Sequence, residues 1–185
     1  MKQKIEWCPI EKTTAHHTRI FDIENIRSIS PEGEEKTFIS INSPEWAIVV
    51  PTLKKEDDLY FIMVSQWRHG TSCVLKEFPG GVVNKNEKTL DAAKRELLEE
   101  TGYKTRYIDE LGRLFPNPAI MQNMCHIFFA ECEEQSVSQN TDSDEFIDVS
   151  LVPYKELITH MGRPPYQHAL MCSALFLYLQ KYGHI

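Results

Sequence analysis

Three glutamates crowd one short segment of the chain, and their spacing raises the question of what balances their charge. Glu96, Glu99 and Glu100 lie within five residues. On a helix, Glu96 and Glu100 form an i,i+4 pair of like charges, which is repulsive by roughly 0.2–0.5 kcal/mol even when exposed. Arg95 can reach Glu99 at i+4, which leaves the other two without an obvious side-chain cation. We therefore expect a positive ligand at this segment.

The residue types indicate which ligand that is. Oxygen ligands in surplus, with no histidine or cysteine among them, favour Mg²⁺ or Mn²⁺ over zinc. The alternative interpretation is a solvated acidic helix face whose charges only keep the protein in solution. The residues around the glutamates distinguish a cation site from a solvated helix face.

The element that must position these carboxylates is a helix over 89–102. Thr89 is expected as its N-cap and Gly102 as the residue that ends it. An apolar stripe at helical spacing predicts the buried face: Leu90, Ala93 and Leu97. At 100° per residue, Glu100 lies about 60° and Glu96 about 100° from Leu97, so both carboxylates flank that face.

The remaining pattern predicts α+β with a mixed sheet, because strands precede and follow this helix and two helices end the chain. Alternation and apolar runs predict strands at 18–29, 36–41, 47–53, 59–66, 74–78, 109–115, 124–132 and 145–151. The closing helices are predicted at 153–161 and 167–182. We expect residues 1–44 to form a small antiparallel β subdomain and residues 45–185 the main domain.

Composition excludes several classes of protein. The 185 residues, 42% hydrophobic and 25% charged, are typical of one globular domain with an appendage. A net charge of -7 disfavours nucleic-acid partners. No apolar run is long enough to span a membrane, and the N-terminus lacks the pattern of a signal peptide, so we expect a cytoplasmic protein. Five scattered cysteines indicate reduced thiols.

The spacing around the glutamates resembles the signature of a known family. The order is Gly81, five residues, Glu87, seven residues, Arg95-Glu96-Leu97, one residue, Glu99-Glu100, one residue, Gly102 and an apolar Tyr103. This order matches the complete signature of the Nudix box. From average residue usage, the seven fixed letters have a chance probability on the order of 10⁻⁸ per start. The chain therefore resembles the Nudix hydrolases, which makes a merely solvated acidic helix a poor explanation.

The resemblance implies a fold and a set of metal ligands. Nudix hydrolases have an α/β/α sandwich with a mixed central sheet, and they use Mg²⁺, with Mn²⁺ as a possible substitute, to hydrolyse nucleoside diphosphates linked to another group. Glu96 and Glu100 then correspond to the principal metal ligands, with the backbone carbonyl of Gly80 as a further ligand. Glu99 corresponds to a ligand or catalytic support.

Two further box residues have supporting roles in this resemblance. Glu87 matches the glutamate that supports the loop, and Arg95 matches the arginine that steadies it by ion pairing.

Residues outside the box resemble one branch of the family, the ADP-ribose pyrophosphatases. Gln66-Trp-Arg-His-Gly70 resembles their Q-Y-R segment, so Arg68 is expected at a substrate phosphate, with a surface ion pair as the alternative. Glu77, in the lead-in to the box, and Pro118, sixteen residues after Gly102, fit the same branch, and the resemblance implies that both bind substrate. Trp46 is a candidate for stacking on the base, with a core tryptophan as the alternative.

The resemblance fades in the loop before a late strand. Glu145 aligns with a metal ligand or catalytic group of that loop, but Ser143 stands where the family often has its general base. Asp142, Asp144, Glu145, Glu99 or a metal-bound hydroxide must then act as the base. A solvated acidic turn is the alternative interpretation of this loop.

The sequence thus predicts a Mg²⁺-dependent pyrophosphohydrolase of nucleoside diphosphate sugars, with ADP-ribose first. Open alternatives are a GDP-mannose-type sugar nucleotide, a dinucleoside polyphosphate or nucleoside triphosphate substrate, and a non-catalytic module that senses a nucleotide. The β subdomain of residues 1–44 resembles the one through which these enzymes dimerise, which implies a homodimer.

Overall fold

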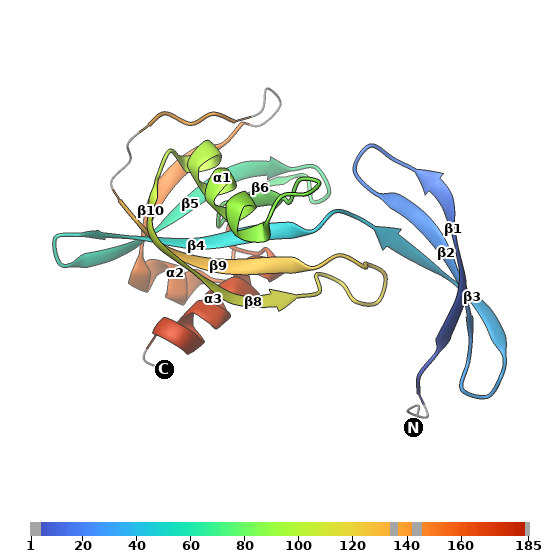
Figure 1. Cartoon of the computed structure of the whole chain (residues 1–185). Helices are drawn as coiled ribbons and strands as arrows, with labels where there is room; N and C mark the ends of the chain where they lie inside the picture. The colour runs from blue at the N-terminus through green and yellow to red at the C-terminus, as the bar shows by residue number, and fades with distance from the viewer. Residues whose placement is uncertain (1–4, 134–136, 142–145, 184–185) are drawn as a thin grey trace. The chain divides into compact units, whose positions relative to one another are not determined.

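The structure, a computed structural model, describes residues 5–133, 137–141 and 146–183 (Figure 1). The chain divides into two compact units. The first contains the described part of Met1–Glu45 together with Phe115–Met124, and the second contains the described parts of Trp46–Leu114 and Cys125–Ile185. The sequence prediction of a subdomain over 1–44 did not include the segment Phe115–Met124.

The first unit is a three-stranded antiparallel sheet with the strand order β1-β2-β3. Its strands are β1 (Cys8–His17), β2 (Asp22–Ile29) and β3 (Glu35–Asn42). The predicted strands correspond to β2 and β3, whereas β1 was not predicted because all its residues are exposed and its polarity does not alternate. The segment Phe115–Met124 joins β3 through the N–H of Ile41, which donates to the carbonyl of Ile120 at 2.7 Å.

The second unit is built on a seven-stranded mixed sheet with the central order β10-β5-β4-β9-β8, in which β6 pairs with β5 and β7 with β4. The strands are β4 (Trp46–Lys55), β5 (Asp58–Arg68), β6 (Cys73–Glu77), β7 (Gly80–Val82), β8 (Thr105–Leu114), β9 (Cys125–Cys132) and β10 (Asp148–Pro153). β4 and β9 are parallel, and the other pairs are antiparallel. The predicted mixed sheet is confirmed, although three-residue β7 was not predicted.

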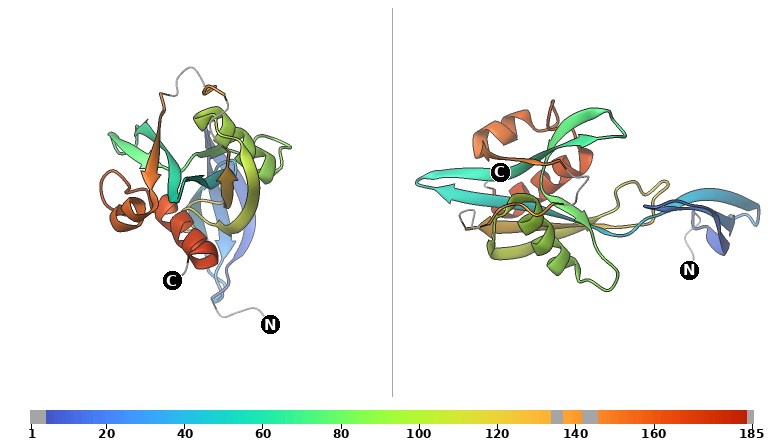
Figure 2. Two further views of the ribbon diagram at one scale, coloured as in Figure 1. Left: turned by 90° about the vertical axis from the view of Figure 1, so that its left-hand side faces the viewer. Right: turned by 90° about the horizontal axis from the view of Figure 1, so that it is seen from above.

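Helices cover both faces of this sheet, as Figures 1 and 2 show, with α1 (Thr89–Thr101) on one face and α2 (Tyr154–His160) and α3 (Ala169–Tyr182) on the other. Alternating residues of β4 explain the arrangement. Ala47 and Val49 pack in one core with α1, whereas Ile48 and Val50 pack in a second core with α3. This is the predicted α/β/α sandwich. Among the described residues, no helix is long and apolar enough to cross a membrane.

Helix α1 follows the prediction closely at its end and less closely at its start. Gly102 is in the left-handed conformation with φ 72°, and its N–H donates to the carbonyl of Leu98 at 2.8 Å. The N-cap is Lys88 rather than Thr89. The predicted buried stripe was also wrong in part, because Leu90, in the first turn, is 37% exposed while Ala92 is buried with Leu97. The two small residues Ala92 and Ala93 let α1 pack closely on the sheet.

Candidate active site

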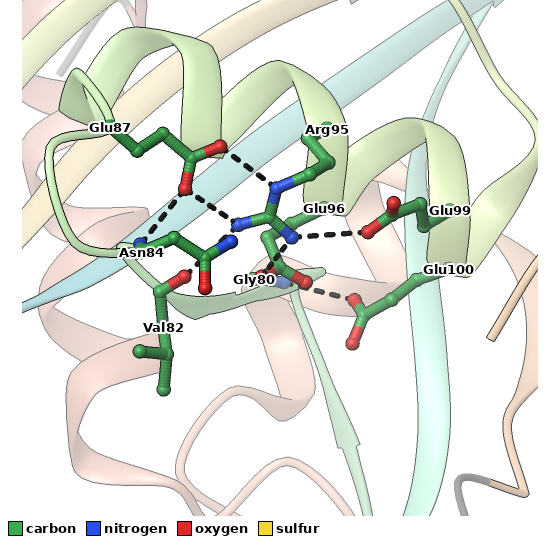
Figure 3. A network of polar contacts seen from close by, with 8 residues as sticks. All are labelled: Gly80, Val82, Asn84, Glu87, Arg95, Glu96, Glu99 and Glu100. Atoms are coloured by element: carbon green, nitrogen blue, oxygen red, sulfur yellow. Dashed lines mark hydrogen bonds and ion pairs between the residues drawn. The ribbon is translucent and has the colours of Figure 1, made fainter. Parts of the chain in front are cut away.

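Arg95 is the centre of a polar network that joins helix α1 to the loop before it (Figure 3). Its Nε and Nη2 donate to the two carboxylate oxygens of Glu87 at 2.8 and 2.9 Å. Its Nη1 donates to Glu96 at 2.8 Å and to Glu99 at 3.1 Å. Nη2 also donates to the carbonyl of Val82 at 3.1 Å. One guanidinium therefore binds three carboxylates and the chain that leads into the helix.

This network corrects the prediction that Glu96 has no side-chain cation. Adjacent residues on a helix do not normally face each other. Here the Arg95 guanidinium binds Glu87 through two hydrogen bonds and also binds the Val82 carbonyl. These contacts orient it so that Nη1 donates to both Glu96 and Glu99. The charge repulsion inferred from the sequence is thus reduced by a cation of the chain itself.

Glu100 is held differently from the other carboxylates. It is only 4% exposed, and its Oε2 accepts a hydrogen bond at 3.0 Å from the backbone N–H of Gly80 (Figure 3). The predicted position at the flank of the buried face is therefore wrong for Glu100, which belongs to that face. A buried carboxylate requires polar partners, and the β7 backbone provides one of them.

Glycines allow β7 to lie between β4 and the carboxylates. A Cβ atom on Gly80 would lie 2.3 Å from the carbonyl oxygen of Ala47 on β4. A Cβ atom on Gly81 would lie 2.6 Å from the carboxyl group of Glu96. Because real Cβ atoms essentially never approach backbone so closely, Gly80 has to be glycine for β7 to pair with β4, whereas a Cβ at Gly81 would require the Glu96 carboxyl group to move.

The ion pair with Arg95 keeps the Glu87 carboxylate charged over a wide pH range because it lowers the pKa of Glu87. Hydrogen bonds from Arg95 lower the pKa of Glu87 from 4.5 to about 2, although partial burial acts in the opposite direction. The backbone N–H of Asn84, which donates to Glu87 at 2.9 Å, lowers this pKa further. The same contacts raise the pKa of Arg95, which is already a permanent cation.

We expect the contribution of Glu87 to stability to be lost in acid. Its pKa is about 2 in the folded protein and 4.5 when unperturbed, so the unfolded chain binds the proton first as the pH falls. The stabilisation, on the order of 2 kcal/mol, is complete above pH 5 and decreases progressively as the pH falls through 4.5 towards 2. Urea unfolding of wild type and Glu87→Gln should differ clearly at pH 7, and the difference in stability should shrink as the pH falls and disappear only near pH 2.

Glu32→Gln is the matched control for this experiment, because Glu32 is an exposed glutamate in a turn. The stability of Glu32→Gln from urea unfolding should equal that of the wild type at every pH. A Glu87→Gln variant with wild-type stability at pH 7 would contradict the assigned ion pair.

A cavity of about 920 Å³ lies over this network, entirely within the second unit. Its lining includes seven residues singled out from the sequence: Trp46, Arg68, Gly80, Arg95, Glu96, Glu99 and Glu100. The volume is in the range of small-molecule sites. The structure thus brings most of the predicted site residues together, although β4, β5, β7 and α1 contribute them separately.

Other predicted site residues do not line the cavity. Glu77 is completely buried and binds Arg68 through two contacts, Nε to Oε1 at 3.0 Å and Nη2 to Oε2 at 2.5 Å. It therefore orients Arg68 instead of reaching a substrate. Pro118 belongs to the first unit, and Glu145 with Asp142, Ser143 and Asp144 lies outside the described residues. Roles for Pro118 and Glu145 stay predictions.

The residues at the cavity fit a divalent cation by their chemistry. Glu96, Glu99 and Glu100 are oxygen donors on one helix that face one cavity, which suits a hard cation. In the part of the chain that the structure describes, no three such side chains stand close enough together to hold a metal. The contacts explain this, because Arg95 holds Glu96 and Glu99 while Gly80 binds Glu100.

Sequence reasoning missed several residues of the cavity, notably Asn84, Asn140 and His168. The backbone N–H of Asn140 donates to the carbonyl of Glu99 at 2.8 Å, and the side chain of Gln139 donates to the carbonyl of Glu100 at 2.6 Å. These contacts fix residues 139–140 to the end of α1. The polar composition of the loop at 139–140 could have indicated that it lies at the site, whereas no local pattern in the sequence indicated that His168 does.

Comparison with known proteins agrees with this geometry. Residues 44–171 match the NUDIX domain. The ADP-ribose pyrophosphatase of Bacillus subtilis is 32% identical over 112 residues, which span 59% of this chain and 60% of that protein. The ADP compounds hydrolase NudE of Escherichia coli is 24% identical over 166 residues, 89% of this chain and 87% of that protein.

A solved structure shows the same fold. The crystal structure of an ADP compounds hydrolase superimposes with a TM-score of 0.82 at 23% identity and covers all of both chains. At that identity, the similarity supports the fold alone.

Proposed function

The chain belongs to the NUDIX family, and from that premise we propose that it hydrolyses the diphosphate bond of nucleoside diphosphate sugars. ADP-ribose is the first candidate, and the products are a nucleoside monophosphate and a sugar phosphate. One observation carries the proposal: the three carboxylates of α1 and the Arg68 guanidinium line the same cavity. That cavity is large enough for a nucleotide sugar, and its lining offers carboxylates to a cation and a guanidinium to a phosphate.

We propose that Glu96, Glu99, Glu100 and the carbonyl of Gly80 hold a divalent cation, Mg²⁺ with Mn²⁺ as a substitute. When bound, such a cation neutralises the diphosphate and activates a water for attack on phosphorus. A protein with a net charge of -7 otherwise repels a diphosphate, which supports a need for cations at the site.

The chain's own residues have the task of positioning. Glu87 and Arg95 fix the loop between β7 and α1, and Arg95 also binds the Val82 carbonyl at the end of β7, so that the carboxylates keep one orientation. Glu77 holds Arg68, whose guanidinium donates to a phosphate oxygen in this proposal. Glu99 is 37% exposed at the cavity and is the described carboxylate best able to take the proton of the attacking water, with Glu145 as the other candidate.

We also propose a homodimer formed through the first unit. This unit exposes large apolar side chains that a partner subunit would cover, among them Ile10, Ile20, Phe38 and Ile39. We further propose that Trp46 stacks on the base of the substrate and that Pro118 contributes to substrate binding. The cytoplasmic location rests on the sequence alone.

Hydrolysis of a substrate panel tests the proposed function. The panel contains ADP-ribose, GDP-mannose, UDP-glucose, diadenosine polyphosphates and deoxynucleoside triphosphates, each with Mg²⁺ and then Mn²⁺. We expect ADP-ribose to give the highest kcat/KM and to yield AMP and ribose 5-phosphate, identified by phosphorus NMR. Faster turnover of another member would change the assigned substrate, and no turnover of any member would favour a nucleotide-sensing module.

A further inference from the structure

His168 lines the cavity but has no part in the mechanism proposed above. It precedes helix α3 as its N-cap, and its ring lines the cavity. Nδ1 accepts a hydrogen bond from the backbone N–H of Leu170 at 3.2 Å. Because Nδ1 needs a lone pair for this contact, the proton of the neutral ring is on Nε2. His168 is thus a donor at Nε2.

The surroundings of His168 keep the ring neutral. Burial lowers its pKa, and of the two charged groups that act on it, Arg68 lowers the pKa further while Glu77 raises it. At neutral pH the ring therefore presents a polar N–H and not a positive charge. Such a donor suits an oxygen acceptor that already has cations elsewhere around it.

The backbone around His168 is fixed to the strand that leads into the site. The N–H of Lys76 donates to the carbonyl of Pro165 at 3.0 Å. On the other side, the N–H of Phe78 donates to the sulfur of Met171 at 3.2 Å. These contacts bracket Glu77, the residue that holds Arg68. The ring is consequently held in a defined position beside the Arg68–Glu77 pair, which is what a substrate-binding group needs.

The Nε2 atom is available to a ligand. Within residues 5–133, 137–141 and 146–183, Nε2 has no hydrogen-bond partner. It is not one of the fully buried polar atoms that lack a partner, so a molecule in the cavity can reach it. An N–H in this position donates to water or to a ligand in the cavity.

We propose that His168 is a further substrate-binding residue, which donates its Nε2–H to an acceptor oxygen of the nucleotide sugar on the Arg68 side of the cavity. The inference rests on the proposed function. The acceptor is either a phosphate oxygen or a hydroxyl of the terminal sugar, and the experiment separates the two. His168 thereby combines two tasks, since Nδ1 caps α3 and Nε2 contacts the substrate.

Two substitutions separate the capping task from the binding task. In His168→Asn the side-chain oxygen can still accept from the Leu170 N–H, but no donor remains at the position of Nε2. In His168→Gln the longer side chain can place an amide N–H near that position. We expect His168→Asn to keep the wild-type melting temperature and to raise KM for ADP-ribose by about 10-fold to 100-fold, with a smaller change in kcat. His168→Gln should recover part of this loss.

Calorimetric binding of ADP and of ADP-ribose identifies the acceptor. If affinity for both ligands falls in His168→Asn, the contact is to a phosphate oxygen, and if affinity falls only for ADP-ribose, the contact is to the sugar. The matched control is His160→Asn, because His160 is exposed at the end of α2 and lies outside the cavity. It should bind both ligands as the wild type does.

The same measurements separate failure of this inference from failure of the proposed function. Turnover by the wild type tests the proposed function. Unchanged KM and unchanged affinities in His168→Asn would overturn the role of His168 even if the wild type is active, as would losses that only parallel a lower melting temperature. If the wild type hydrolyses nothing, the binding affinities still decide the role of His168, and absence of any binding would overturn it as well.

Discussion

Replacing Glu100 with glutamine should reduce turnover of the preferred substrate by roughly 10²-fold to 10³-fold, with the fold preserved. The substitution keeps the shape of the side chain, and the glutamine oxygen can still accept from the Gly80 N–H, which is 3.0 Å from Glu100. It removes one negative charge from the buried position where we propose that the cation binds. The measurement is kcat/KM with Mg²⁺, together with the melting temperature of each variant.

A suitable control for this experiment is Glu110→Gln. Glu110 lies on β8, pairs with Arg113 at 2.6 Å and is not part of the cavity. It should retain wild-type turnover, because losing a surface ion pair changes stability by at most about 1 kcal/mol. Wild-type turnover by Glu100→Gln itself would refute the assignment of Glu100 to the cation site.

Gly80→Ala should have the largest effect on stability. Its Cβ would lie 2.3 Å from the carbonyl oxygen of Ala47 and 2.8 Å from the Cα of Ile48, and both are backbone atoms of the central strand β4. Because backbone cannot move aside like a flexible side chain, β7 would have to separate from β4. We expect a loss of about 3 kcal/mol or more, and a melting temperature lower by roughly 6–12 °C for a chain of this size.

Gly70→Ala is the matched control, because a Cβ at Gly70 would meet no atom within 4 Å. Its melting temperature should stay close to that of the wild type. Thermal unfolding followed by circular dichroism compares the two variants directly. A Gly80→Ala protein as stable as Gly70→Ala would mean that β7 does not pair closely with β4.

The sequence predicted the elements whose pattern is local. The helix that carries the carboxylates ends at Gly102 as expected, because a glycine in the left-handed conformation is a strong local signal. The apolar runs that became β4 and β5 were equally clear, since central strands buried on both faces are nearly continuous in hydrophobicity. The fold class and the Nudix resemblance followed from these elements and from the spacing of the box.

Elements without such a pattern were missed or misplaced. Strand β1 is exposed throughout, so no alternation marks it. Strand β7 has only three residues, and two glycines allow its close approach to β4 and to Glu96. Leu90 fits the apolar periodicity of α1 but is 37% exposed, because periodicity predicts a face of the helix and not how far the neighbouring sheet extends over it.

The sequence by itself determined which residues carry the charge of the site, because the glutamates and Arg95 follow a spacing that a helix and its preceding loop convert into proximity. Only the tertiary structure decided how they are paired. The guanidinium of Arg95 covers Glu96 as well as Glu99 because Glu87 and the Val82 carbonyl hold it from outside the helix. The reach of a long, hydrogen-bonded side chain depends on these distant partners, and local periodicity does not contain them.

The same holds for His168. It joins a cavity with residues that lie far earlier in the chain, because the backbone beside β6 fixes the start of α3 next to Glu77 and Arg68. The sequence shows only a histidine before a helix. Its position in the cavity, and with it our assignment of a donor to the substrate, depends on packing between elements that are distant in sequence.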